Sequence, residues 1–226
     1  MTRLITLSFD NGPTPGVTDM VLEALDRHGI SATFFVLGKN LQTSQSRDLM
    51  ALAAQRGHWI GNHTFHHDIP FGENPDPRAV EAEIESTQAL IGKLSHPDRL
   101  FRPFGKGGLI GHHLLSCAAA DHLLANHYTC VLWNAIPRDW ENVYDWPDIA
   151  LGQCRAQNWS LIVLHDYDTG AMKQLDNFIC RAVGEGMQFV QAFPPDCVPI
   201  RRGQPQTPLD AIVARSVNHY NQEQRV

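Results

Sequence analysis

Polar side chains that can serve as acids, bases or metal ligands follow directly after several apolar runs of this sequence. Asp10 and Asn11 follow residues 4–9, and His165 follows residues 161–164. Taken alone, residues 10–13 favour a simple turn. If the runs are parallel strands, however, the groups after them meet at the end of the fold where α/β barrels have their active sites. A carboxylate and an imidazole placed there can act as general base and general acid.

Two histidines four residues apart form a second candidate group. His63 and His67 would lie on one side of a helical turn, a separation that many zinc sites use. Exposed helices show the same spacing by chance, so spacing alone leaves a ligand role and a surface role open. His66 lies between them out of phase and is expected at the surface or beside the site. The remaining histidines are expected in solvent at helix ends and in loops: His28, His58, His96, His112, His113, His122, His127 and His219.

A positive charge inside an apolar run requires a partner. Arg102 lies within residues 100–104, and a guanidinium buried without a carboxylate is costly, so the sequence predicts an acidic group nearby. Asp10 is the candidate partner of Arg102, and Asp139 is the candidate partner of His165. The first pair would keep Asp10 ionised as a base, and the second would keep His165 protonated as an acid. A hydrolase requires one group of each kind. A structural ion pair at Arg102 is the alternative.

Seven short runs rich in β-branched and aromatic residues must position these groups. They cover residues 4–9, 32–37, 59–60, 100–104, 128–133, 161–164 and 187–190. Segments with helical periodicity lie between them, most clearly at 17–28, 49–56, 80–91 and 175–183, and less clearly at 111–126 and 145–157. The alternation predicts parallel βα units of an α/β protein, with a closed or nearly closed barrel favoured over a doubly wound open sheet.

The length of 226 residues fits one large domain. We expect the catalytic barrel within residues 1–191. From residue 192 to 226 the composition shifts to Pro, Gln, Arg and Asn, which predicts an appendage of loop and one short helix packed on the same domain.

Charge and hydropathy exclude several classes of partner. With 18 Lys and Arg against 24 Asp and Glu, the net charge is −6, so a domain-wide basic surface for nucleic acid is absent. No apolar run approaches the roughly 18 to 20 residues that a membrane span requires. The N-terminus shows no secretory pattern, and five widely spaced cysteines fit reduced thiols. These features predict a cytoplasmic protein, and the bare barrel expected within residues 1–191 predicts a soluble substrate.

The order of the motifs resembles the polysaccharide deacetylases of carbohydrate esterase family four, including the nodulation-type chitooligosaccharide deacetylases. The resemblance runs from about residue 4 to residue 190 and is strongest at residues 7–13, 32–38 and 61–64, together with His67. It implies the distorted (β/α)7 barrel of that family. It also implies hydrolysis of the N-acetyl group of an amino sugar or short oligosaccharide, with release of acetate and a free amine.

The resemblance assigns a role to each candidate residue. Asp10 matches the general base, Arg102 the arginine that tethers it, His165 the catalytic acid and Asp139 the carboxylate that supports the acid. The metal ligands would be Asn11, His63 and His67, holding a divalent cation that is usually zinc, with cobalt or nickel as alternatives. The oxyanion would rest on this cation and on a backbone N–H near Phe104 and Gly105. Phe104 and Trp140 are candidate walls for the sugar ring.

Three departures from the family pattern bear on this reading. The family has a second aspartate where this chain has Asn11, so the cation would be held less tightly and less neutralised. The third motif, residues 102–105, is one residue short, and Ile136 replaces a carboxylate of the fourth. Two other functions on the same fold therefore stay open, namely metal-independent hydrolysis of a small amide or ureide and sugar binding without catalysis.

Overall fold

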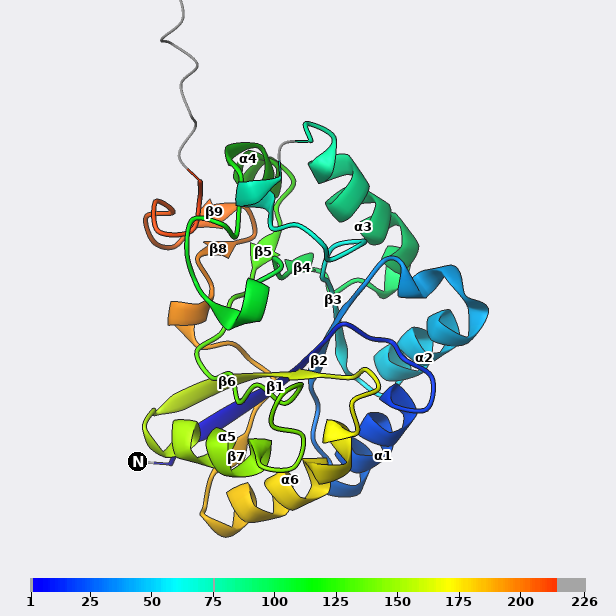
Figure 1. Ribbon diagram of the computed structural model, residues 1–226, viewed down its shortest axis with the longest axis vertical. Helices are drawn as coiled ribbons and strands as arrows, with labels where there is room; N and C mark the ends of the chain where they lie inside the picture. Colours follow the sequence, from blue (N-terminus) through cyan, green and yellow to red (C-terminus); the bar gives the residue numbers. More distant parts are fainter. Residues whose placement is uncertain (1, 75, 215–226) are drawn as a thin grey trace, which may run out of the picture.

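The computed structural model describes residues 2–74 and 76–214. Its centre is a curled sheet whose first strands run parallel and whose helices lie outside it (Figure 1). The parallel strands are β1 Leu4–Asp10, β2 Thr33–Val36, β3 Trp59–Asn62, β4 Leu100–Phe101, β5 Thr129–Cys130, β6 Trp159–His165 and β7 Gln188–Phe189. Each of the seven predicted apolar runs therefore overlaps a strand.

Helices connect these strands as the sequence predicts. They are α1 Thr18–His28, α2 Ser44–Gln55, α3 Ser86–Ile91 preceded by a π-helical segment Val80–Glu85, α4 Cys117–Ala125, α5 Trp146–Arg155 and α6 Leu175–Gly184. Helix α1 ends at Gly29, which adopts a left-handed conformation with φ of 62°. Helices α2 and α4 begin where the hydroxyl groups of Thr43 and Ser116 accept backbone hydrogen bonds from the first helical turn.

Hydrogen bonds close the curled sheet into a distorted barrel. The strand order is β6-β1-β2-β3-β4-β5, and β7 pairs with β1 at Leu4 and Ile5. The ring closes through a parallel bridge between Ala135, which follows β5, and Ile162 of β6. The closed or nearly closed barrel predicted from the sequence is therefore correct, and the open doubly wound sheet is not adopted.

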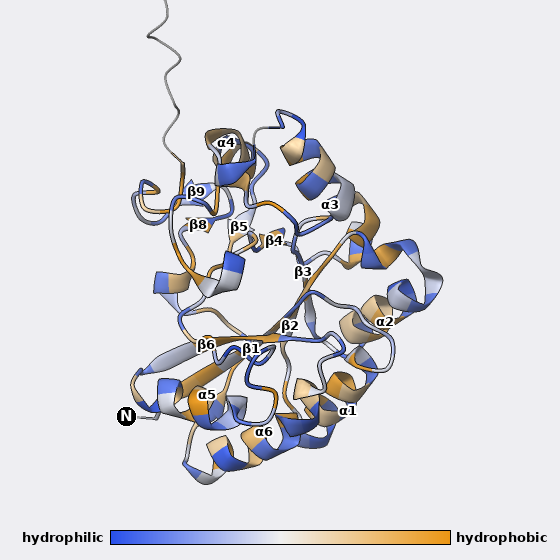
Figure 2. Ribbon diagram, in the orientation of Figure 1, coloured by the Kyte–Doolittle hydropathy of each residue, from blue (hydrophilic) through white to orange (hydrophobic). Residues whose placement is uncertain are grey.

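Alternate residues of each strand point inside and outside the barrel. Outward residues of β1 and β2, among them Leu7 and Phe34, pack with helices α1, α2, α5 and α6 in the largest apolar cluster. Figure 2 shows these apolar residues along the two strands. A smaller cluster contains Phe35, Leu100 and Val131. The inward residues of β1 are polar instead, and this prepares the barrel interior for a charged group.

The described part of the segment after residue 191 contains two strands that the sequence did not predict. It forms a 3₁₀ turn at Pro195–Cys197 and the strands β8 Ile200–Arg201 and β9 Gln204–Pro205. Strand β8 pairs antiparallel with β5, so the segment extends the sheet and buries Ile200. The short helix expected in this segment is not formed between residues 192 and 214. Residues 215–226, with His219, lie outside the described residues. No described helix is long and apolar enough to cross a bilayer.

His58 corrects a second expectation, because it is buried and not in solvent. Only 5% of its surface is exposed, and its ring lies edge-on to Phe34 with the centroids 5.3 Å apart. Its Nδ1 accepts the N–H of Ala32 at 3.1 Å, so the imidazole joins the starts of β2 and β3. Burial lowers the pKa of His58 to about 4.

The lowered pKa of His58 predicts a loss of stability in mild acid. Between about pH 6.5 and pH 4 the unfolded chain binds a proton at this position that the folded chain does not, so the free energy of unfolding falls as the pH falls through this window. In His58→Asn, whose amide oxygen can still accept the Ala32 hydrogen bond, urea unfolding should show a shallower pH dependence there. The exposed His112→Gln is the control, and equal slopes in both variants would contradict the prediction.

Candidate active site

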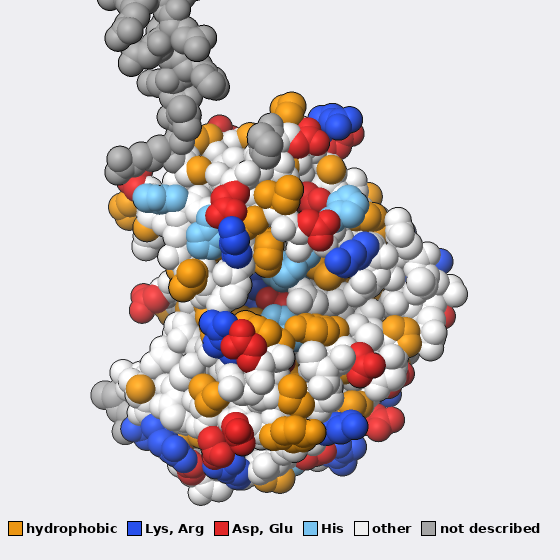
Figure 3. All heavy atoms as spheres, in the orientation of Figure 1, with side chains coloured by type: hydrophobic (Ala, Val, Ile, Leu, Met, Phe, Trp, Pro, Cys, Tyr) orange, Lys and Arg blue, Asp and Glu red, His pale blue; other side chains and the backbone are white. Residues whose placement is uncertain are grey.

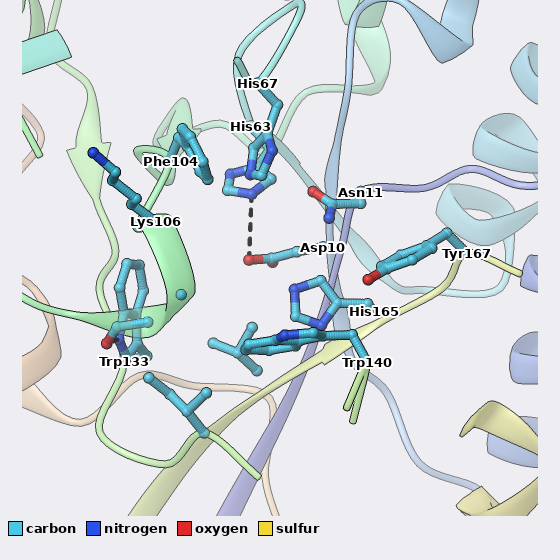
Figure 4. Close-up of a pocket in the computed structure, with 15 residues that line it drawn as sticks. Asp10, Asn11, His63, His67, Phe104, Lys106, Trp133, Trp140, His165 and Tyr167 are labelled. Carbon is cyan, nitrogen blue, oxygen red and sulfur yellow. Dashed lines mark hydrogen bonds and ion pairs between the residues drawn. The ribbon is translucent and has the colours of Figure 1, made fainter. Parts of the chain in front are cut away.

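A cavity of about 190 Å³ lies at the carboxyl end of the parallel strands. Figure 3 shows the hollow on this face, with acidic and histidine side chains visible inside it, and Figure 4 shows its lining. Of the predicted site residues, all but Arg102 and Asp139 line the cavity, and these two are buried behind it. The lining consists of Asp10, Asn11, His63, His67, Phe104, Gly105, Lys106, Gly107, Gly108, Trp133, Ile136, Trp140, Val163, His165 and Tyr167.

Arg102 holds Asp10 in place from inside the barrel. Its guanidinium is fully buried, and Nη1 donates to Asp10 Oδ1 at 2.8 Å and to the hydroxyl of Ser8 at 2.7 Å. Nε and Nη2 donate to the carbonyl groups of Val131 and Leu132. Every nitrogen of the side chain is therefore satisfied, which a buried guanidinium requires. The second oxygen of Asp10 is left facing the cavity and His63.

His165 lies beside Asp10 because the two residues are in register on neighbouring strands. Its Nδ1 lies 2.8 Å from Oδ1 of the fully buried Asp139, and its backbone N–H donates to Asp139 Oδ2 at 2.9 Å. Burial alone would lower the pKa of His165, but the hydrogen bond and charge of Asp139, with the charges of Asp10 and Asp166, raise it above its usual value. The protonated form of the imidazole is thus favoured, as the sequence predicts.

The two cavity histidines come together without a helix. Residues 63–67 form an irregular segment after β3, in which Thr64 and His67 have positive φ angles of 72° and 61°. The backbone N–H of Thr64 donates to the side-chain oxygen of Asn62 at 2.9 Å. This turn brings the rings of His63 and His67 to 4.6 Å between centroids. The helical turn expected from their spacing is not formed, but the two rings are close together as that spacing predicts. His66 is exposed, as expected.

The chemistry of this cluster suits a metal ion. Nδ1 of His63 lies 2.8 Å from the carbonyl oxygen of Arg102, so this nitrogen carries the proton and Nε2 is left as a lone-pair donor. Burial lowers the pKa values of His63 and His67 to about 3 and about 2, which keeps both imidazoles neutral. The side-chain oxygen of Asn11 is buried and accepts no hydrogen bond within the described residues. Within residues 2–74 and 76–214 no three His, Cys, Asp or Glu form a metal-binding group.

The walls of the cavity are largely aromatic. The ring of Phe104 lies 4.0 Å from that of His67, and Trp140 lies edge-on to His165 with centroids 4.9 Å apart. Nε1 of Trp133 donates to the carbonyl of Gly108 at 2.9 Å. A Cβ at Gly105 would overlap the Trp133 ring, so glycine lets this loop lie against the indole. The shortened third motif is thus supported by the segment that follows β5.

Sequence reasoning missed Asp166, a buried carboxyl directly after the predicted acid. Its Oδ2 accepts the hydroxyl hydrogen of Thr18 at 2.6 Å, and a Cβ at Gly12 would overlap its carboxyl group. Asp166 therefore holds the loop that carries Asn11 against the end of β6. Burial raises its pKa to about 7. Their position in the sequence could have identified Asp166 and Tyr167 as site residues, because both directly follow the strand that ends at His165.

Comparison with known proteins identifies what this site is similar to. The polysaccharide deacetylase family model matches residues 2–108. The chain is 32% identical to a chitooligosaccharide deacetylase of Rhizobium leguminosarum bv. trifolii, covering 73% of this chain and 72% of that protein. It is 30% identical to a peptidoglycan-N-acetylglucosamine deacetylase of Bacillus cereus, covering 73% of each.

Solved structures show the same architecture. Peptidoglycan deacetylase PdaC from Bacillus subtilis matches with a TM-score of 0.68 at 26% identity, over 84% of this chain and 88% of the solved chain. The chain spans only 38% of the full length of PdaC. The predicted barrel of the polysaccharide deacetylase type is confirmed by this similarity.

Removal of Arg102 should destabilise the fold as well as the site. Arg102→Met leaves Asp10 buried without its cation, and breaking a buried pair in this way costs about 3–5 kcal/mol of unfolding free energy. Asp10→Asn in the same chain should recover part of that loss. Arg27→Met, which removes a solvent-exposed pair with Asp176, is the control and should leave the free energy of unfolding nearly unchanged. Equal urea midpoints for the two single variants would contradict the prediction.

Proposed function

The chain belongs to the polysaccharide deacetylase family, and from this premise we propose that it hydrolyses the N-acetyl group of an amino sugar or short oligosaccharide and releases acetate. The observation that carries the proposal is the pairing of Asp10 with His165 at one cavity, each supported by its own buried partner. This arrangement provides a base and an acid a short distance apart, as amide hydrolysis requires. Aromatic walls of this kind suit the faces of a sugar ring.

We propose that the site works with a divalent cation, zinc in the first instance and cobalt or nickel as alternatives. Asn11, His63 and His67 would hold it. Their fit rests on two neutral imidazoles and an amide oxygen that accepts no hydrogen bond from any residue the structure describes. When bound, the cation would supply Lewis acidity to a water and to the acetamide carbonyl. The amide donor carries no charge, so we expect weaker binding than with a carboxylate.

The residues of the chain account for the proton transfers. Asp10, oriented by Arg102, accepts a proton from the water that attacks the acetamide carbon. The N–H groups of Phe104 and Gly105 donate no hydrogen bond within the described residues, so they are free to stabilise the oxygen as it gains negative charge. His165, whose Nδ1 is engaged by Asp139, donates its Nε2 proton to the nitrogen as the C–N bond breaks. The products are acetate and the free amine.

Acetate release from chitooligosaccharides tests this function. We expect turnover that is lost on chelation and restored by zinc, cobalt or nickel. Asp10→Asn should lower kcat/KM by about 10²- to 10⁴-fold, because the base is lost while the shape is kept. The exposed Asp48→Asn is the control. Turnover of a small amide that survives chelation would favour the metal-independent alternative, and sugar binding without any turnover would favour a binding protein.

Asn11→Asp tests the proposed ligand set separately. A carboxylate at this position adds a negative charge to the two imidazoles, so the Kd for zinc should fall by about tenfold or more, or roughly 1.4 kcal/mol. Calorimetric titration of metal-free protein measures this without reference to activity. The exposed Asn177→Asp controls for the change in net charge. An unchanged zinc affinity in Asn11→Asp would show that Asn11 is not a ligand.

A further inference from the structure

The hydroxyl of Tyr167 points into the catalytic cavity from the side of the acid. Tyr167 lies two residues after His165 on the loop that follows β6, and its ring is edge-on to the imidazole, with centroids 5.6 Å apart and planes at 79°. Figure 4 shows the phenol oxygen directed toward the space between Asp10 and His165. The ring is half-buried, so the loop holds the hydroxyl at the wall of the cavity.

This hydroxyl has no partner within the described residues, although the proposed base and the proposed acid beside it each have one. Asp10 is bonded to Arg102, and His165 to Asp139, whereas no side-chain hydrogen bond of Tyr167 is formed. Burial and the charge of Asp139 raise the pKa of Tyr167 above its usual value, which keeps the phenol neutral and able to donate. A polar group at a partly apolar wall gains most from an acceptor that a ligand brings.

The neighbours of Tyr167 limit what that acceptor can be. Trp140, like Tyr167, lies edge-on to the imidazole of His165, so aromatic surface flanks the acid and a polar substrate group there has few donors to choose from. In the proposed reaction His165 must lie beside the amide nitrogen in order to protonate it. The adjacent phenol would then lie near the substituents of a carbon next to the one that bears the nitrogen. In a chitooligosaccharide the nitrogen is on carbon 2, and of its two neighbours carbon 1 carries the ring and glycosidic oxygens while carbon 3 carries a free hydroxyl group. A simple acetamide has no such hydroxyl.

We propose that Tyr167 is a specificity-determining residue whose hydroxyl donates a hydrogen bond to the substrate hydroxyl adjacent to the acetamide. The proposal rests on the proposed deacetylase function and names the chemical group that the site recognises beyond the acetamide itself. It selects amino sugars over simple amides, because a substrate without that hydroxyl leaves the half-buried phenol without an acceptor from the substrate.

The test combines a change in the enzyme with a matched change in the substrate. Tyr167→Phe removes only the phenol oxygen, and a chitooligosaccharide analogue that lacks the hydroxyl at carbon 3 of the reacting sugar removes only the proposed acceptor. We expect Tyr167→Phe to lower kcat/KM for the natural sugar by about tenfold and to leave kcat/KM for the deoxy analogue within about twofold of the unaltered enzyme. Tyr144→Phe, at a tyrosine that is 79% exposed, is the matched control and should change neither.

Two outcomes would overturn the proposal. An equal loss with both substrates would show that the oxygen acts on the fold or on the chemistry and not on the adjacent hydroxyl, and no loss with either would show that it makes no productive contact. If the unaltered enzyme releases no acetate from any of these sugars, the deacetylase function fails. Calorimetric binding of the same two sugars to Tyr167→Phe and Tyr144→Phe then decides the question for Tyr167, with equal affinities in both proteins counting against it.

Discussion

The rest of the structure depends on a guanidinium buried inside the barrel. Arg102 is held over the ring of Phe35, with 4.1 Å from its central carbon to the ring centroid, and needs an acceptor for each nitrogen because no water reaches it. β1 supplies Ser8 and Asp10, and the chain after β5 supplies two carbonyl groups. Strands on opposite sides of the barrel must therefore supply acceptors to the Arg102 side chain. The same hydrogen bonds stabilise the fold and orient the carboxylate of Asp10.

Closure of the barrel also places the acid. The segment after β5 contacts β6 at Ala135, whose carbonyl accepts the N–H of Val163 at 3.1 Å. Four residues later in the same segment, Asp139 accepts the backbone N–H of His165. The side chain of Asn134 strengthens this junction by accepting the N–H of Leu161. The hydrogen bonds that seal the ring thus bring a buried carboxylate under the imidazole. Acid and base are then adjacent because β1 and β6 pair in register.

Local patterns predicted the strands and most of the site, because apolar runs and the residues after them depend on near neighbours in sequence. The carboxylate partner of Arg102 followed from the cost of burying a lone charge, whereas Asp139 was proposed as the partner of His165 without such a constraint. Other features arise only from tertiary contacts. β8 forms because β5 offers a free edge, and His58 is buried because β2 requires an acceptor at its start. The positive φ angles around His63 are likewise set by hydrogen bonds that no periodicity reveals.

The pairing pattern also bears on the proposed cation site, in which an amide oxygen would take the place of a carboxylate. Asp10 is the carboxylate nearest His63, with 3.5 Å between Oδ2 and Nε2, and its charge is already shared with Arg102. A cation beside Asn11 and the two imidazoles would therefore keep most of its charge. Such a cation would be bound more weakly and would polarise a bound carbonyl more strongly, and both effects follow from the smaller number of negative ligands. Such a site would gain more from substrate contacts elsewhere in the cavity, and the hydroxyl of Tyr167, which bonds to none of the described residues, lies where one of them can form.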